Sequence, residues 1–109
     1  MATLAAGVRE ALGMLRPGLE EIYGERLQGL LLFGSQARGD AREDSDIDVA
    51  VLLKGPVKDA AEITRTSWLS QRINLETGLL VSCVYLTRED LEGGREAIYC
   101  NILHEGVGL

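Results

Sequence analysis

The sequence of 109 residues has few cysteine, histidine, aromatic and basic residues, and these shortages argue against several classes of function. Neither of its two cysteines, Cys83 and Cys100, has a second cysteine or a histidine at metal-ligand spacing. This argues against a zinc cluster or a disulfide framework and favours two buried, reduced thiols in a cytoplasmic protein. The one histidine, His104, is more typical of a helix end than of a catalytic base or a metal ligand.

Basic residues are outnumbered, because 11 lysines and arginines face 17 acidic residues and give a net charge of −6. A general nucleic-acid binder needs a basic face, so this balance argues against one. A nucleotide substrate remains compatible, since bound Mg²⁺ would supply the local positive charge. Long apolar runs are also missing, so no membrane span is expected. The N-terminus lacks the basic and then apolar segments of a secretory signal.

The rest of the composition is that of a soluble globular protein, with 46% hydrophobic and 26% charged residues. The length suits one modest core, and the sequence contains no repeat, low-complexity tract or long linker. We therefore expect residues 1–109 to form a single domain.

The hydrophobic spacing predicts an α/β (α+β) fold, in which helices pack on a small mixed β-sheet. The expected helices cover residues 3–15, 19–26, 57–77 and 96–104, and a helical turn is expected at 36–38. Pro17-Gly18 is expected to separate the first two helices, and Gly78 to end the long one. The expected strands cover residues 27–33, 47–53 and 79–86, and a polar loop is expected over 39–45. Thr87 is predicted to cap a helix, with an acidic residue three positions later. The buried positions expected on the long helix are Ala60, Ile63, Trp68, Ile73 and Leu75.

The segment from residue 34 to residue 48 carries the candidate chemistry. Gly34 lets the backbone approach a phosphate, and Ser35 offers a hydroxyl and an N–H to the same anion. Asp46 and Asp48 lie two residues apart at the start of a predicted strand, so their side chains share one face. Carboxylates at this spacing can bind Mg²⁺ together with substrate phosphates. A phosphate cradle facing a metal-binding pair is the minimum apparatus for transferring a nucleotidyl group.

The same segment, in the run LLFGSQARGDAREDSDIDVAVLL over residues 31–53, resembles the nucleotidyltransferase superfamily of the DNA polymerase β type. More narrowly, the chain resembles the minimal nucleotidyltransferases (MNT), small bacterial and archaeal proteins that are often encoded beside a HEPN-domain partner. The matching positions are Gly34, Ser35, Ala37, Gly39, Ser45, Asp46 and Asp48. The ending over residues 101–107 also looks like the short tail of some minimal members.

This resemblance implies a polymerase β-type fold and a magnesium-dependent, ATP-binding transferase. Asp46 and Asp48 would be the catalytic and metal-binding residues, and Gly34 and Ser35 would bind the nucleotide, ATP or another NTP. Arg38 could contact the triphosphate, or it could pair with the nearby acidic residues Asp40, Glu43 or Asp44. Ser45 could orient Asp46 for nucleotide binding, or it could simply close the turn.

One departure from the family bears on catalysis. Members typically carry a third carboxylate on the strand that follows the long helix, and residues 79–86 contain no acidic residue. Ser82 is the expected equivalent position, and Glu76 is an alternative source of the missing carboxylate. Without a third carboxylate, a second Mg²⁺ would be held weakly.

Two functions follow as expectations from the resemblance. In the first, the chain transfers AMP from ATP to a hydroxyl, with a tyrosine of a HEPN toxin as the acceptor, and acts as the antitoxin of a toxin–antitoxin pair. In the second, it is a weak or inactive nucleotide-binding module that neutralises the HEPN partner by docking and forming a complex with it. An antibiotic-modifying transferase is less favoured, because such enzymes usually add a domain that holds the drug.

Overall fold

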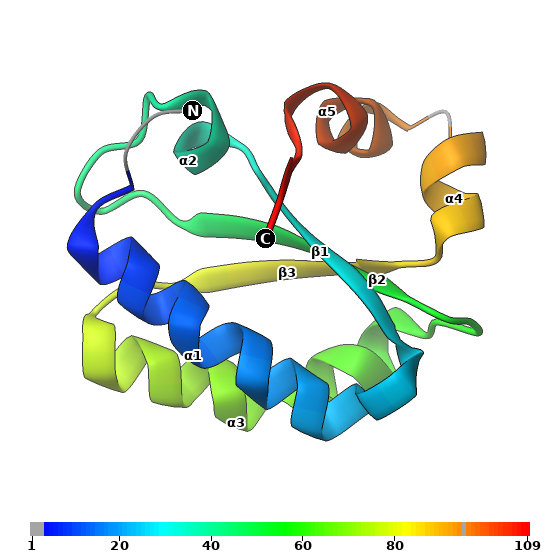
Figure 1. Cartoon of the computed structure of the whole chain (residues 1–109), viewed down its shortest axis with the longest axis horizontal. Coiled ribbons are helices and arrows are strands. Elements are labelled where there is room, and N and C mark those ends of the chain that lie inside the picture. Colours follow the sequence, from blue (N-terminus) through cyan, green and yellow to red (C-terminus); the bar gives the residue numbers. More distant parts are fainter. Residues whose placement is uncertain (1–3, 95) are drawn as a thin grey trace.

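The computed structural model describes residues 4–94 and 96–109, which form a four-stranded sheet with helices on both faces (Figure 1). The elements are α1 (Ala6–Tyr23), the 3-10 helix η1 (Gly24–Arg26), β1 (Leu27–Phe33), α2 (Ser35–Arg38), β2 (Ile47–Leu53), α3 (Asp59–Thr77), β3 (Val81–Leu86), α4 (Arg88–Gly93), α5 (Ala97–Glu105) and β4 (Val107–Gly108). The predicted α/β class is thereby confirmed, as are the bounds of the first two strands. The short strand β4 was not predicted.

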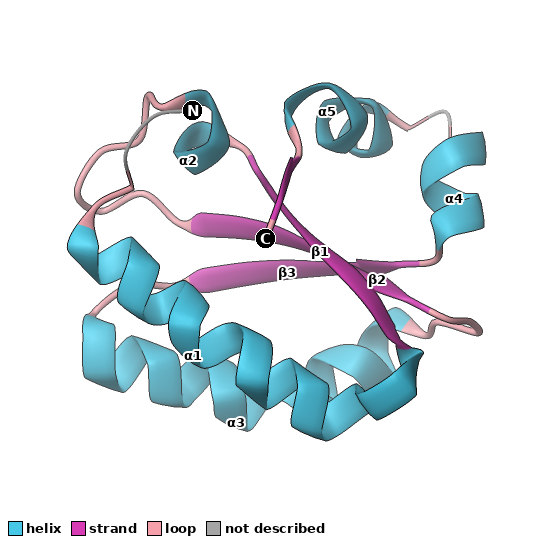
Figure 2. Ribbon diagram, in the orientation of Figure 1, coloured by secondary structure: helices cyan, strands magenta, loops and turns pink. Residues whose placement is uncertain are grey.

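The sheet is mixed, as the sequence predicts, and its strand order is β3-β2-β1-β4. Strand β1 pairs antiparallel with both β2 and β4, whereas β2 and β3 are parallel (Figure 2). A parallel pair needs a long crossover, and α3 supplies it. This topology brings the end of β1 and the starts of β2 and β3 to one edge of the sheet.

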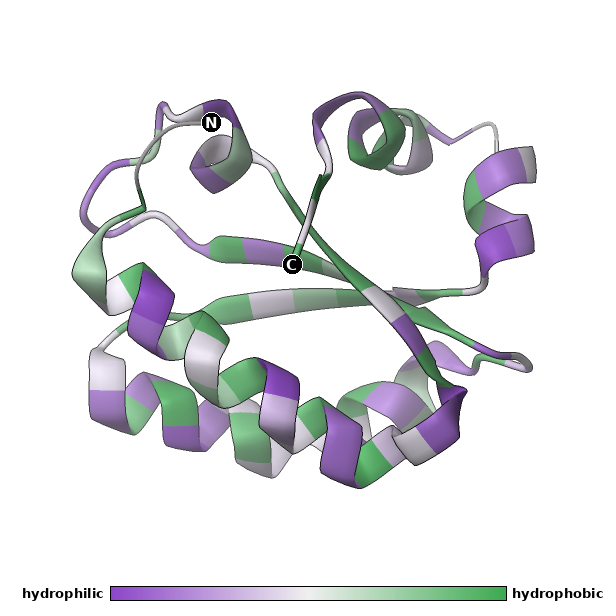
Figure 3. Ribbon diagram, viewed as in Figure 1, coloured by the Kyte–Doolittle hydropathy of each residue, from purple (hydrophilic) through white to green (hydrophobic). Residues whose placement is uncertain are grey.

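The two faces of the sheet pack into two apolar clusters (Figure 3). Alternate residues of β2, from Ile47 to Leu53, face α1 and α3, while Ala50 and Leu52 face α4 and α5. A central strand buried on both faces reads as a continuous apolar run, which is why β2 was recognisable in the sequence. Since side chains alternate along a strand, Asp48 belongs to the face that α5 covers.

The predicted break at Pro17-Gly18 is wrong, because α1 runs through it as one helix from Ala6 to Tyr23. The proline costs the helix one backbone N–H but does not end it. Gly18 is buried, and a Cβ added there would collide with the side chain of Leu69 in α3. The glycine is therefore the point of close helix–helix contact and not a turn signal.

The predicted buried face of α3 is also wrong, except at Ile73. Ile63, Trp68 and Leu75 are 57%, 47% and 86% exposed, and Ala60 is exposed as well. The residues that are buried instead are Glu62, Thr66, Leu69 and Ile73. Two of these four are polar, so hydrophobicity alone selects the wrong side of the helix.

The polar residues of the buried face are satisfied by tyrosines from other elements. The hydroxyl of Tyr23 donates to the Glu62 carboxylate at 3.1 Å, and the hydroxyls of Thr66 and Tyr85 lie 2.5 Å apart. These contacts join residues that are distant in sequence, so a sequence pattern could not reveal them. Tyr85 is buried in the core, whereas Trp68, which the sequence places among the buried residues, is not.

The helix ends predicted at Gly78, Thr87 and His104 agree with the structure, whereas the predicted burial of one of the two cysteines does not. Gly78 ends α3 with a positive φ of 74°, and Thr87 and Asp90 form a reciprocal capping box at the start of α4. His104 lies in the last turn of α5, as expected. Cys83 is half-buried, which raises the pKa of its thiol to about 11, but Cys100 is exposed, so its predicted burial is wrong. No helix within the described residues is both long and apolar enough to cross a membrane.

Candidate functional site

The glycine–serine turn and the second aspartate meet where β1 ends and β2 begins. Phe33, the last residue of β1, is the register partner of Asp48, so the chain enters the turn at Gly34 beside that carboxylate. Gly34 has a φ of 73°, a value that L side chains rarely adopt, and a Cβ there would collide with the Asp48 carboxylate. Only glycine combines this conformation with this close approach.

The turn continues into α2, a single helical turn. The carbonyl of Gly34 accepts the N–H groups of Ala37 and Arg38 at 3.1 and 3.0 Å. Ser35 is the first residue of α2 and is half-buried. The predicted helical turn is thus confirmed, and it fixes where the backbone and hydroxyl of Ser35 stand relative to β2.

The two aspartates differ in their surroundings. Asp46 is exposed just before β2, whereas Asp48 is half-buried inside the strand. Burial and the neighbouring charge of Asp46 raise the pKa of Asp48 above its ordinary value, and the charge of Glu105 raises it further, while Arg38 opposes them. A bound divalent cation would relieve the strain between these like charges.

These donors fit a small, hard cation, but they are a pair and not a larger cluster. Carboxylate oxygens are the ligands that Mg²⁺ prefers, and the ion commonly uses one or two of them together with phosphate oxygens and water. Across residues 4–94 and 96–109, no group of three or more acidic, histidine or cysteine residues is arranged to hold a metal ion. Any ion at Asp46 and Asp48 would therefore complete its coordination with water or with oxygens of a substrate.

The raised pKa of Asp48 predicts that the charged form of this residue destabilises the folded, metal-free protein. We expect Asp48→Asn to raise Tm at neutral pH without Mg²⁺ by a few degrees at most, since the group is only partly buried. Because the pKa of Asp48 is higher in the folded state than in the unfolded state, the difference in Tm between Asp48→Asn and the wild type reaches its full size above the folded-state pKa. It should vanish as the pH falls through the folded pKa to below the unfolded one.

The check is thermal unfolding of both proteins from neutral to acidic pH, with and without Mg²⁺. Added Mg²⁺ should raise the Tm of the wild type and should leave that of Asp48→Asn unchanged. A lower Tm for Asp48→Asn at neutral pH would show that the carboxylate stabilises the fold.

The two other residues predicted to bind nucleotide take part in local contacts. Arg38 is exposed, and its guanidinium pairs with Asp40 at 3.2 Å and with Glu105 at 3.0 Å. These hydrogen bonds raise the pKa of Arg38 above its ordinary value. The Ser45 hydroxyl accepts the Arg42 N–H at 2.8 Å and so closes the polar loop. A role in nucleotide binding stays a prediction for both.

The register of strands β2 and β3 indicates which residue stands at the position of the missing third carboxylate. Asp48 and Ser82 are direct partners across the parallel β2–β3 pair, so their side chains share a face of the sheet, and the strands lie about 4.8 Å apart. Ser82 is exposed at this position. Glu76, the alternative, pairs with Arg72 on the exposed surface of α3 at 3.3 Å. The register therefore favours Ser82 as the equivalent position.

Glu105 is the residue of this site that the sequence analysis missed. It ends α5, and its carboxylate accepts the backbone N–H of Gly34 at 3.1 Å, across 71 positions of sequence. Its side chain is 22% exposed. The resemblance of residues 101–107 to the tails of minimal family members was the one available signal, and it did not single out this carboxylate.

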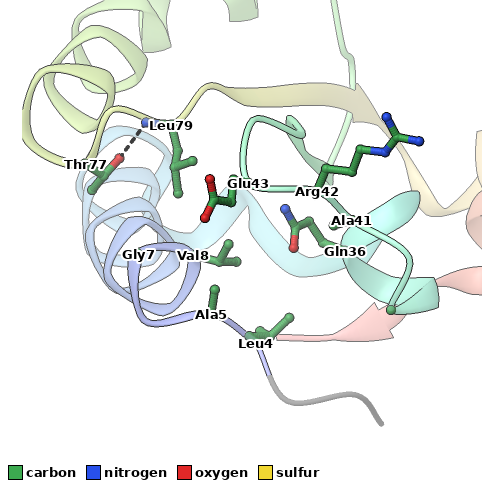
Figure 4. Close-up of a pocket in the computed structure, with 11 residues that line it drawn as sticks. Leu4, Ala5, Gly7, Val8, Gln36, Ala41, Arg42, Glu43, Thr77 and Leu79 are labelled. Carbon is green, nitrogen blue, oxygen red and sulfur yellow. Dashed lines mark hydrogen bonds between the residues drawn. The ribbon is translucent and has the colours of Figure 1, made fainter.

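A hollow of about 400 Å³ lies beside the polar loop and not at the aspartates (Figure 4). Leu4 and Val8 line it from the α1 side, Gln36 and Glu43 from the loop side, and Leu79 from the segment before β3. None of the residues that line it is Gly34, Ser35, Asp46 or Asp48. The candidate nucleotide site is thus separate from this hollow.

Known proteins resemble the chain in both sequence and structure. The family model of the nucleotidyltransferase domain matches residues 12–99. The candidate protein adenylyltransferase MJ0141 of Methanocaldococcus jannaschii is 32% identical over 75 aligned positions, and the match covers 67% of this chain and 73% of that protein.

Solved structures share the fold. A toxin–antitoxin structure with AMP-PNP has a TM-score of 0.62 at 24% identity, over 88% of this chain and 69% of that one. A complex of the tri-AMPylated Shewanella oneidensis HEPN toxin with its MNT antitoxin has a TM-score of 0.57 at 20% identity, over 92% and 69% of the two chains. With the family model covering most of its length, the chain belongs to the nucleotidyltransferase domain family, and its fold is that of the minimal nucleotidyltransferases.

Proposed function

We propose that this nucleotidyltransferase-family protein moves AMP from Mg-ATP to a hydroxyl of a partner protein. Asp46 and Asp48 would hold Mg²⁺, and Gly34 and Ser35 would cradle the β- and γ-phosphates. The observation that carries the proposal is the packing of the Gly34 backbone against the Asp48 carboxylate. A phosphate bound at the turn would lie next to the carboxylates, where it could share their metal ion.

The reaction is a displacement at phosphorus. The acceptor hydroxyl oxygen forms a bond to the α-phosphorus, the bond from that phosphorus to the oxygen bridging to the β-phosphate breaks, and pyrophosphate leaves with the electron pair. The hydroxyl proton passes to solvent. When bound, Mg²⁺ neutralises charge on the phosphates and the leaving group. The chain's own residues fix the phosphates relative to the acceptor, and such positioning supplies most of the acceleration in phosphoryl transfer.

The acceptor we propose is a tyrosine of a HEPN-domain toxin, with this chain as the antitoxin. Support comes from the relatives, since one similar structure contains a tri-AMPylated HEPN toxin bound to an MNT antitoxin and another contains AMP-PNP. The similarity to a candidate protein adenylyltransferase favours ATP as the donor and a protein as the acceptor. Such a pair would act in the cytoplasm, where Mg-ATP is abundant.

A second function is favoured by one observation, the serine at position 82. A neutral hydroxyl beside Asp48 leaves Asp46 and Asp48 without a third carboxylate on β3, and this pair would hold a second metal ion weakly. A chain with slow or absent transfer could still neutralise a HEPN ribonuclease by docking on it.

The experiment that separates the two functions is incubation with labelled ATP, Mg²⁺ and a HEPN-domain protein offered as the acceptor. Mass spectrometry of the HEPN protein should find AMP on a tyrosine when Mg²⁺ is present and none when EDTA is added. Inhibition of the ribonuclease without any AMP on it would instead support docking. If neither occurs, the antitoxin role is wrong.

Ser35→Ala is expected to weaken Mg-ATP binding while leaving the fold intact. The hydroxyl stands at the start of α2 outside the apolar clusters, so its loss removes one hydrogen bond to a phosphate oxygen. The expected loss is about 1 kcal/mol, or about fivefold in Kd, and more if the contact is to a charged oxygen. Titration calorimetry measures Kd, and Ser67→Ala, on the exposed surface of α3, is the matched control. A large drop in the Tm of Ser35→Ala alone would make Ser35 a structural residue.

A further inference from the structure

The carboxylate of Glu105 occupies a well-defined anion position at the candidate nucleotide site. One of its oxygens accepts the Gly34 N–H at 3.1 Å, and both lie within hydrogen-bond distance of Nη1 of Arg38, at 3.0 and 3.1 Å. A main-chain N–H and a guanidinium that converge on one pair of oxygens form a small anion-binding site. In this structure, a side chain of the protein itself fills that site.

The donors that hold Glu105 are also the donors that a phosphate would use. Gly34 and Arg38 belong to the proposed nucleotide-binding set, and an arginine fork recognises carboxylate and phosphate oxygens with similar geometry. The Gly34 N–H has a single hydrogen and already donates it to Glu105, so a phosphate cannot accept it until Glu105 releases it. Nη1 of Arg38 is likewise engaged by both oxygens of the same carboxylate. A like charge at this distance would also repel an incoming triphosphate.

The backbone around Glu105 is anchored, so the exchange must involve the side chain. Ile102, one turn earlier in α5, is 1% exposed in the cluster under this helix, and the Gly106 N–H donates to its carbonyl at 2.8 Å. Beyond Gly106, strand β4 pairs with Leu31 and Leu32 of β1. The end of α5 is thus fastened on both sides of the glutamate, while the carboxylate reaches partly exposed space. Rotation of the Glu105 side chain can vacate the site without unfolding the helix.

We propose that Glu105 holds the place of a substrate phosphate and competes with the nucleotide for Gly34 and Arg38. This inference rests on the proposed nucleotide site and assigns that site a residue that limits its affinity. In the empty protein, the carboxylate neutralises Arg38 and satisfies the Gly34 N–H. When Mg-ATP binds, a phosphate takes both donors and the Glu105 side chain turns out to solvent. Nucleotide affinity is therefore lower than the cradle alone would give.

The test compares binding of Mg-ATP and of inorganic triphosphate with Mg²⁺, by titration calorimetry, in the wild type, Glu105→Gln and Glu105→Ala. Glutamine keeps the length and shape of the side chain but removes the charge and most of the hold on Arg38. Both variants should bind both probes about tenfold more tightly than the wild type. Glu92→Gln, which makes the same charge change at an exposed position of α4, is the matched control and should bind as the wild type does.

The other outcomes separate a failure of the proposed Glu105 competition from a failure of the proposed nucleotide-binding function. If the wild type binds Mg-ATP and the Glu105 variants bind it equally or more weakly at unchanged Tm, Glu105 supports the site and the competition is wrong. If only the Mg²⁺ dependence weakens, Glu105 is a metal ligand, which also overturns the inference. If neither the wild type nor any variant binds either probe, the proposed nucleotide site itself fails.

Discussion

Replacing Asp46 and Asp48 together with asparagine should lower nucleotidyl transfer by at least 10²-fold, the order of effect seen when one main electrostatic contact to a transition state is removed. Asparagine keeps the shape of both side chains but removes the two negative charges that would hold Mg²⁺. The fold should survive, because Asp46 is exposed and the charge of Asp48 is unfavourable in the metal-free protein. The loss should therefore appear in metal binding and catalysis and not in stability.

The measurements are pyrophosphate release with the HEPN partner present, and titration of ATP with Mg²⁺ or with EDTA. The wild type should bind ATP more tightly with Mg²⁺, and the double variant should show no such difference. Glu43→Gln with Asp44→Asn makes the same change of charge in the exposed part of the same loop and serves as the control. Equal ATP affinity for the wild type and the double variant in both buffers would show that the site is not metal-dependent.

The elements that frame the site could be predicted because their signals are local. Strands β1 and β2 are short apolar runs bounded by turn residues. Their observed first and last residues are those predicted from the sequence. Gly34 has the positive φ that its place in the turn requires. The segment from Gly34 to Asp48 joins β1 to β2, so the antiparallel pairing of these strands brings the glycine–serine turn and the two aspartates to one end of the sheet.

The errors arise where distant residues decide the local structure. Gly18 is read as a turn signal, but it is a contact point because Leu69 of α3 packs on it. Glu62 is absent from the predicted buried positions of α3, but it is buried because the Tyr23 hydroxyl and other donors satisfy its carboxylate. Glu105 reaches the site only because α5 folds back over β1, and the resemblance of residues 101–107 to the tails of minimal family members does not by itself indicate this contact.

The charge distribution of the site explains why a cation is needed for its proposed reaction. The protein carries a net charge of −6, and Asp46, Asp48 and Glu105 all lie near the proposed phosphate position. Within residues 4–94 and 96–109, Arg38 contacts Glu105 of this group, and it pairs with Asp40 as well. A triphosphate without a metal ion would thus meet mainly like charge. We therefore expect the proposed site to bind the magnesium complex of the nucleotide more tightly than the free anion.

Restoring the third carboxylate should have the opposite effect to removing the first two. Ser82 is the direct register partner of Asp48 on the parallel strand, its side chain shares that face of the sheet, and it is exposed, so an aspartate fits there without disturbing the core. Ser82→Asp would place a third oxygen ligand about one strand spacing from Asp48. That charge would anchor the ion that activates the acceptor hydroxyl, and we expect AMP transfer to rise by about tenfold or more.

The charge introduced by Ser82→Asp should also change the thermal stability of the protein, and this effect can be measured without a partner protein. A third carboxylate beside Asp48 adds repulsion, so Ser82→Asp should have a lower Tm than the wild type without Mg²⁺. Added Mg²⁺ should raise its Tm by more than it raises that of the wild type, because the folded protein now binds the ion more tightly. Ser82→Asn, which has the same shape and no charge, is the control and should show neither effect.

Transfer assays across a range of Mg²⁺ concentrations decide between the two proposed functions. A slow or inert wild type that Ser82→Asp accelerates, with the acceleration reached at lower Mg²⁺, means that the natural serine limits catalysis, and the biological work of the protein then rests on docking. Robust transfer by the wild type that is lost in Ser82→Asp would contradict the argument. It would mean that two carboxylates suffice here, or that the partner protein supplies the third ligand.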